Sequence, residues 1–145
     1  MDFAPLEIPG AFVVTALRRH DERGYFARLW CSETFRAKGI APGIAQINTG
    51  FSPRAGTLRG MHYQRAPHGE TKVVRCVHGE LFDVLVDLRR DSPTFRKWYG
   101  LRLDPEDGRM RVVPEGCAHS YLTLRADPEL VSLASGAYEP GAATW

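Results

Sequence analysis

The chain has 145 residues, of which 43% are hydrophobic and 25% are charged, and its formal net charge is +2. These values are ordinary for a soluble globular protein and predict one domain over residues 1–145. The weak charge, the absence of a long apolar segment and the scattered cysteines argue against a nucleic-acid partner, a membrane span, and a disulfide framework or zinc site. The first residues also lack the pattern of a signal peptide, so we expect a cytoplasmic protein.

Short apolar or alternating segments, separated by Gly and Pro turns, predict β-strands along most of the chain. The predicted strands are Phe12–Leu17, Tyr25–Cys31, Ile44–Phe51, Thr57–Gln64, Thr71–Val77, Glu80–Leu88, Phe95–Leu103, Met110–Val113, Cys117–Leu124 and Leu130–Ala134. One short helix is expected over Glu33–Lys38, capped by Ser32 and followed by Gly39. The two-residue turn His78-Gly79 predicts a β-hairpin between its flanking strands. The pattern is typical of an all-β antiparallel sandwich or jelly roll with one short helix.

Several ionisable residues lie on predicted strands that otherwise resemble barrel core. Alternation along the strands places Lys72, Asp83 and His119 each on the same face as apolar neighbours. A barrel normally fills its interior with apolar side chains, or uses polar ones to hold a ligand. Ionisable groups that converge there suggest a site for an anionic or carbonyl-bearing small molecule.

Arg59 and His62 belong to the same predicted strand but have opposite parity. A regular strand points such residues to opposite faces, so both reach one interior only if the strand contains a bulge. Gly60 is the natural position for it. The sequence therefore predicts an irregularity at Gly60.

Each of these residues also has an ordinary structural explanation. A single His in a strand, such as His62, is more often a hydrogen-bonded scaffold residue than a catalyst. Lys72 and Arg59 are also suited to the exposed edge of a sheet, where charges oppose aggregation. Asp83 fits a half-exposed strand, and His119 fits a turn after Pro-Glu-Gly. These explanations would all have to hold at once, which makes the combination more informative than any single residue.

Ordered motifs across residues 10–140 resemble the dTDP-4-dehydrorhamnose 3,5-epimerase family, which comprises cupin-type jelly rolls that act on nucleotide-linked 4-keto-6-deoxy sugars. The matching segments include Asp21-Glu22-Arg23-Gly24-Tyr25-Phe26, Gln46-Ile47-Asn48, Leu58-Arg59-Gly60-Met61-His62-Tyr63-Gln64, Lys72-Val73-Val74-Arg75-Cys76, Gly79-Glu80-Leu81-Phe82-Asp83-Val84, Pro114-Glu115-Gly116-Cys117-Ala118-His119 and Tyr138-Glu139-Pro140. The resemblance implies an epimerase of deoxysugar biosynthesis that needs no metal or other cofactor.

The resemblance also implies roles for individual residues. His62 resembles the general base that removes a proton beside the ketone, and Lys72 resembles the cation that stabilises the enolate oxygen. The residues that resemble contacts to the sugar or diphosphate are Arg23, Phe26, Gln46, Asn48, Arg59 and His119. Asp83 resembles a supporting residue near the base. Family members are homodimers, so a homodimer is expected, with residues 1–17 as the swapped element.

The chain departs from the family pattern at three places. Ser132 stands where the family has its catalytic Tyr, and a Ser hydroxyl is a shorter and weaker acid. Arg28 replaces an acidic residue that helps to hold the nucleotide. The family also continues beyond the Trp that Trp145 matches, and that segment carries an Asp that pairs with the base. Tyr138 is the nearest phenol in sequence to Ser132, so it is the predicted proton donor, with Tyr121, Tyr63 or water as alternatives.

These departures leave three hypotheses. The first is an epimerase or related isomerase, inverting one or both centres of a dTDP-linked sugar. The second is a non-catalytic homologue that binds a nucleotide sugar or a protein. The third is a metal-dependent cupin enzyme, which is disfavoured because Gln64 stands where the second His of an H-x-H ligand pair would be.

Overall fold

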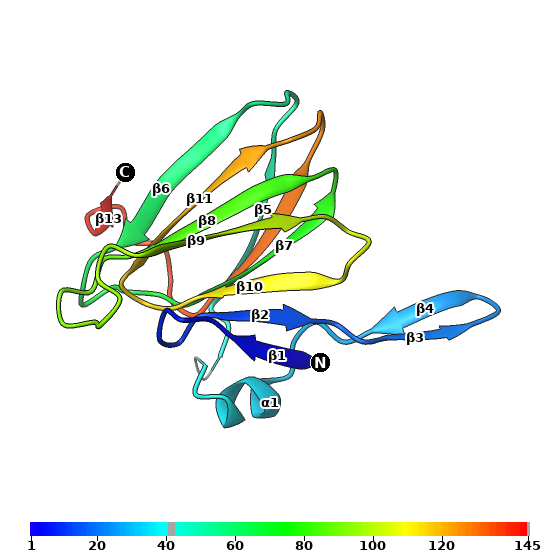
Figure 1. Cartoon of the computed structure of the whole chain (residues 1–145), viewed down its shortest axis with the longest axis horizontal. Coiled ribbons are helices and arrows are strands. Elements are labelled where there is room, and N and C mark those ends of the chain that lie inside the picture. Colours follow the sequence, from blue (N-terminus) through cyan, green and yellow to red (C-terminus); the bar gives the residue numbers. More distant parts are fainter. Residues whose placement is uncertain (41–42, 145) are drawn as a thin grey trace.

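The computed structural model describes residues 1–40 and 43–144, and it contains two facing antiparallel sheets with a two-stranded arm (Figure 1). The elements are β1 (Asp2–Pro5), β2 (Phe12–Thr15), β3 (Arg18–Asp21), β4 (Gly24–Ala27), α1 (Ser32–Ala37), β5 (Gln46–Phe51), β6 (Leu58–Gln64), β7 (Lys72–His78), β8 (Leu81–Asp87), β9 (Trp98–Leu103), β10 (Arg109–Val113), β11 (Cys117–Thr123), β12 (Glu129–Ala134) and β13 (Ala143–Thr144). One sheet has the order β1-β2-β10-β7-β12-β5, and the other has the order β13-β6-β11-β8-β9. The prediction of an all-β jelly roll with one short helix is confirmed.

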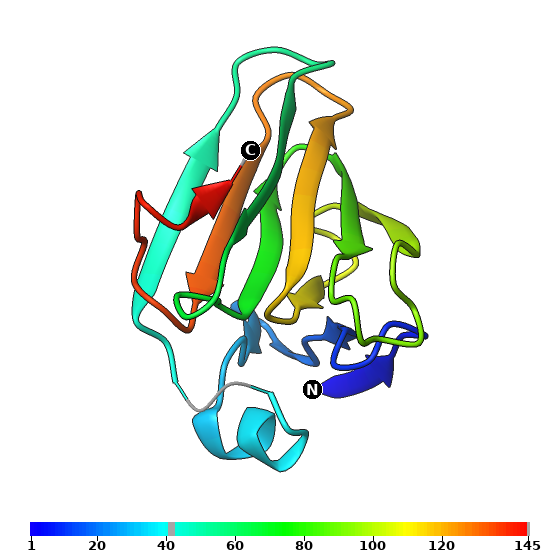
Figure 2. The ribbon, with the colours of Figure 1, turned by 90° about the vertical axis from the view of Figure 1, so that its left-hand side faces the viewer.

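One hydrophobic core lies between the two sheets. Val74 and Cys76 of β7 pack there with Leu81 of β8 and Tyr121 of β11, and all four are buried. Because strand residues alternate between faces, each sheet turns one apolar face inward and its other face outward. Figure 2 shows the strands of the two layers running past one another.

The predicted hairpin at His78-Gly79 is wrong. β7 pairs with β10 and β12, whereas β8 pairs with β9 and β11 in the opposite sheet. The two strands face each other across the core, where both bury apolar side chains, instead of pairing edge to edge. Gly79 has φ +73°, and a Cβ there would lie 2.8 Å from Pro128 Cα, so the crossing turn requires glycine.

The helix is confirmed, but its predicted cap is not. Cys31, and not Ser32, is the N-cap residue, and it makes no side-chain capping bond. Tertiary packing holds the helix instead, because Phe35 is fully buried with its ring 5.1 Å from Phe3 and 4.1 Å from Trp30. A six-residue helix depends on such packing more than on local propensity.

Strands β3 and β4 form a separate arm that extends away from the two sheets (Figure 1). Strand β3 was not predicted, and the strand predicted over Tyr25–Cys31 is shorter, ending at Ala27. Within the described residues, no helix is long and apolar enough to span a membrane.

Candidate functional site

Gly60 lies at the predicted irregularity of β6. His62 pairs with His119 and Arg59 pairs with Tyr121, so two residues of β6 stand opposite the single residue Ser120. Gly60 has φ +116°, and a Cβ there would lie only 2.5 Å from the Ser120 Cβ. The extra residue resets the alternation, which places Arg59 and His62 on the same, inward face. This prediction is confirmed.

A small pocket brings together one residue from each of three strands that the sequence singled out. His62 of β6, Lys72 of β7 and His119 of β11 all line it. The predicted convergence is therefore observed for these three, although β7 lies in the opposite sheet from β6 and β11. Glu70 also lines the pocket, and its Oε1 is 2.9 Å from the Lys72 ammonium.

Burial and the charges around His62 shift the pKa of its imidazole. Burial lowers the pKa of His62 below its ordinary value, and the positive charges of Lys72, of Arg59 and, when it is protonated, of His119 lower it further. A depressed pKa means that the imidazole is neutral at physiological pH and ready to accept a proton. Lys72 has the largest effect of these charged groups on His62, and its ammonium would stabilise an anion formed in the same pocket.

Asp83 lies behind His119 and is fully buried. Its Oδ2 is 2.5 Å from His119 Nε2, and its Oδ1 is 3.1 Å from Arg111 Nε. Asp83 therefore supports a residue of the pocket wall and lies outside the wall itself. Arg59 bonds to Ser52 and to the carbonyl of Phe51, beside the same cluster.

Strands β5 and β12 continue the sheet of β7 beside the residues that line this pocket. Ser132 pairs with Asn48 on one side and with Val74 on the other, which places all three on the inward face. Gln46 follows the same alternation, and its Oε1 accepts a hydrogen bond of 2.8 Å from the backbone N–H of Tyr138. Gln46 thus fixes the segment that carries Tyr138, whose side chain is exposed.

Tyr121 is the phenol that lies deepest in the interior. It is 8% exposed, and a Cβ added at Gly50 would lie 3.1 Å from its hydroxyl, which therefore reaches across to β5. Burial raises the pKa of Tyr121, with Arg59 acting in the opposite direction. Its ring is 6.3 Å from that of His119.

Arg23 and Phe26 do not reach the pocket within one chain. They belong to the β3–β4 arm, where Phe26 is 66% exposed and Arg23 bonds to Asp21 at 2.6 Å (Figure 1). The predicted contacts of these two residues therefore require a second molecule or a different position of the arm.

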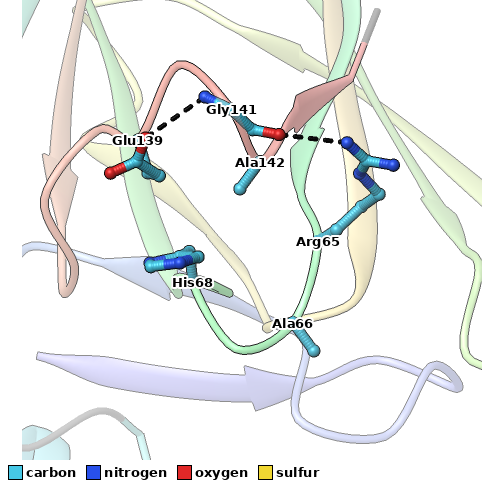
Figure 3. Close-up of a pocket in the computed structure, with 6 residues that line it drawn as sticks. All are labelled: Arg65, Ala66, His68, Glu139, Gly141 and Ala142. Atoms are coloured by element: carbon cyan, nitrogen blue, oxygen red, sulfur yellow. Dashed lines mark hydrogen bonds between the residues drawn. The ribbon is translucent and has the colours of Figure 1, made fainter.

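A second hollow lies where the segment after β12 returns to β6, as Figure 3 shows. Arg65 donates to the carbonyl of Gly141 at 3.0 Å, and the side chain of Glu139 accepts from the Gly141 N–H at 3.2 Å. Nearby, Gln64 donates to the carbonyls of His68 and Ala137. These bonds tie the Tyr138 segment to β6, close to His62.

Sequence reasoning missed two residues of the site. Glu70 lies two residues before Lys72, and this spacing puts both side chains on one side of an extended chain. Arg111 follows the alternation of β10 to the inward face, where it pairs with Val74 in register. An Arg inside an otherwise apolar strand was the available signal for a buried charge.

Comparison with known proteins places the chain among sugar epimerases. The family model described as dTDP-4-dehydrorhamnose 3,5-epimerase matches residues 5–144. Enzymes of that name from Sinorhizobium fredii and Mycobacterium tuberculosis are each 40% identical to the chain, over 88% and 93% of its length. The chain spans about two thirds of these relatives, 65% and 67% respectively.

Solved structures show the same likeness. The crystal structure of the Bacillus anthracis epimerase, with TDP and PPi bound, has a TM-score of 0.94 and 30% identity, covering 99% of this chain and 82% of that one. The M. tuberculosis epimerase has a TM-score of 0.93 and 38% identity, covering 99% of this chain and 72% of that one.

Proposed function

The chain belongs to the dTDP-4-dehydrorhamnose 3,5-epimerase family, and we propose that it epimerises a dTDP-linked 4-keto-6-deoxyhexose at one or both carbons beside the ketone. The observation that carries this proposal is the meeting of His62 and Lys72 in one pocket, with the pKa of His62 depressed. The activity belongs to deoxysugar biosynthesis, in the cytoplasm, and needs no cofactor.

The proposed chemistry is proton transfer at carbon. Neutral His62 removes the proton from the carbon next to the 4-keto group, and the electron pair moves to the carbonyl oxygen to form an enolate. The Lys72 ammonium stabilises that oxygen, a type of contact worth about 3–4 kcal/mol when a single donor is removed. Return of a proton from the opposite face inverts the centre, and the electron pair of the enolate forms the new C–H bond.

Glu70 tunes this arrangement. Its carboxylate is 2.9 Å from Lys72, and both side chains are largely buried. The pair fixes the ammonium in place, and it also offsets part of the positive charge that the enolate would meet. Glu70→Gln should therefore strengthen enolate stabilisation while loosening the position of Lys72.

The proton donor is assigned to Tyr138. Ser132 lies on the inward face and pairs with Asn48, so β12 provides no phenol at that position. Tyr138 follows on a segment held by Gln46 and by Gln64, and Gln64 lines the pocket. Tyr121 is the alternative donor from within the interior, since its phenol lies beside Arg59.

A homodimer would complete the substrate site. Arg23 and Phe26 lie on the exposed arm, away from their own pocket, and a bidentate guanidinium suits a diphosphate. In the proposed homodimer, the arm of one copy would contact the nucleotide bound by the other. Sedimentation analysis of the wild type and an Arg23→Ala variant, with and without dTDP, separates assembly from nucleotide contact.

The test of the proposed function is product analysis. The purified chain is incubated with dTDP-4-keto-6-deoxyglucose, and the sugar is reduced and analysed by NMR for its configuration at carbons 3 and 5. Inversion at either carbon supports the proposal and tells single from double epimerisation. Binding of dTDP without inversion would favour the alternative of a non-catalytic nucleotide-sugar-binding homologue, for which the replacement at Ser132 is the motivating observation. Net transfer of the ketone to carbon 3 would instead favour a ketoisomerase.

A further inference from the structure

Arg111 is a fully buried guanidinium in the interior between the sheets. Its Nη1 donates to the carbonyl of Tyr99 at 3.0 Å, and its Nε lies 3.1 Å from Asp83 Oδ1. Burial lowers the pKa of Arg111, and the charge of Asp83 acts against that shift. Arginine keeps its charge even so, so a full positive charge is held inside the core beside one carboxylate.

Asp83 stands between Arg111 and His119. One carboxylate oxygen faces the guanidinium, and the other is 2.5 Å from His119 Nε2. A carboxylate beside a permanent cation is ionised and can only accept hydrogen bonds. The hydrogen of the Asp83–His119 bond therefore resides on His119 Nε2.

The protonation of the other ring nitrogen of His119 depends on whether another group already neutralises the negative charge of Asp83. A buried carboxylate with His119 as its sole partner would favour the imidazolium, because an opposite charge nearby stabilises the charged form. Arg111 already neutralises Asp83. We propose that Arg111 is a positioning residue that acts through Asp83 to hold His119 as the neutral tautomer, with its hydrogen on Nε2 and an acceptor at Nδ1. This inference rests on the proposed function only for its consequence in the reaction.

The residues around His119 explain why its charge would affect the reaction. His62 and Arg59 face it from β6, Lys72 and Glu70 lie across the pocket, and Tyr121 is its neighbour on β11. Arg59 and Lys72 already add positive charge near His62. An imidazolium at position 119 would add another and make His62 a weaker base.

The neutral tautomer also selects a ligand group. An unprotonated Nδ1 accepts a hydrogen bond, so it is complementary to a hydroxyl of the sugar, whereas an imidazolium is complementary to an oxyanion. His119 lines the pocket beside His62. Arg111 thereby makes the site select for a hydroxyl donor at the sugar position that His119 contacts.

The first measurement needs neither substrate nor a variant. Long-range ¹H–¹⁵N NMR of the imidazoles in the wild-type protein reports the tautomer and charge of His119 at pH 7. We expect the neutral form with hydrogen on Nε2. An imidazolium, or hydrogen on Nδ1 alone, would overturn the proposal.

Arg111→Met tests the cause. With Asp83 no longer neutralised, His119 becomes the imidazolium, because an unopposed carboxylate beside an imidazole stabilises its charged form. Arg109→Met is the matched control, because Arg109 lies on the same strand but pairs with Asp107 near the surface. In the control His119 stays neutral. An unchanged His119 spectrum in Arg111→Met would show that Arg111 is merely structural.

The double variant Asp83→Asn, Arg111→Met removes both buried charges and keeps an acceptor for His119 Nε2. We expect neutral His119 there, even if Arg111→Met alone fails to fold; an imidazolium in the double variant would contradict the account. In turnover assays, kcat/KM of Arg111→Met falls at least about 10-fold and recovers in the double variant. Wild-type protein that lacks turnover but shows the expected His119 tautomer would sink the proposed function and leave this inference standing.

Discussion

Substituting Gly60 by Ala tests whether the bulge in β6 builds the site. A Cβ at this position would lie 2.5 Å from Ser120 Cβ and 2.7 Å from the His119 carbonyl oxygen, distances that require the strands to separate. The positive φ of +116° adds conformational strain of about 1–3 kcal/mol, and overpacking adds about 1–3 kcal/mol more. We therefore expect Gly60→Ala to lower the free energy of unfolding by about 2–6 kcal/mol.

Gly24→Ala is the matched control for this substitution. Gly24 has a similar φ of +126°, but nothing lies within 4 Å of an added Cβ. It should show the conformational part alone, so the two variants should differ by about 1–3 kcal/mol in urea unfolding followed by tryptophan fluorescence. Turnover by Gly60→Ala should also fall about 100-fold, since small displacements of a base are that costly. Equal stabilities for the two variants, with full turnover in Gly60→Ala, would refute the reasoning.

Three further predictions concern the donor, the base and the acid stability of the fold. Tyr138→Phe should lower turnover about 100-fold, as loss of a general acid does, whereas unchanged kcat would transfer the role to Tyr121, Tyr63 or water. Lys72→Met should raise the pKa of His62 toward its ordinary value, so that its NMR titration moves to higher pH; no movement would contradict the proposed electrostatics. Burial would raise the pKa of Asp87, but hydrogen bonds from Arg89, Ser92 and Thr94 lower it well below its ordinary range. Its stabilisation is therefore present above about pH 4 and lost as the pH falls further, so Thr94→Val should destabilise by about 1–3 kcal/mol at pH 7 and by less at pH 3, as chemical unfolding at the two pH values would show.

The strand pattern was readable because burial on one face imposes a period of two. It predicted the core strands β5 to β12 within a few residues, and it located the bulge at Gly60 from the parity of Arg59 and His62. It did not predict which strands pair. The error at His78-Gly79 arose because a two-residue glycine turn also serves a chain that crosses between sheets, and only the tertiary partner Pro128 distinguishes the two.

The sequence predicted those site residues whose orientation toward the pocket follows from the alternation of side chains along one strand. His62, Lys72 and His119 follow from alternation, and the structure brings them together. Arg111 was missed because its partners, Asp83 and Tyr99, come from different strands of the opposite sheet. The distance of Arg23 and Phe26 from the pocket depends on the path of the arm, which no local pattern in the sequence determines.

The central claim is that His62 removes a proton from carbon beside a ketone. The most direct measurement is deuterium incorporation into dTDP-4-keto-6-deoxyglucose in D₂O, followed by NMR at carbons 3 and 5, for the wild type and for His62→Asn. Exchange registers the base even when the donor is slow or absent. We expect exchange by the wild type at one or both carbons and a loss of at least about 100-fold in His62→Asn. Exchange that persists in His62→Asn, or wild-type protein that binds dTDP yet exchanges neither position, would contradict the account.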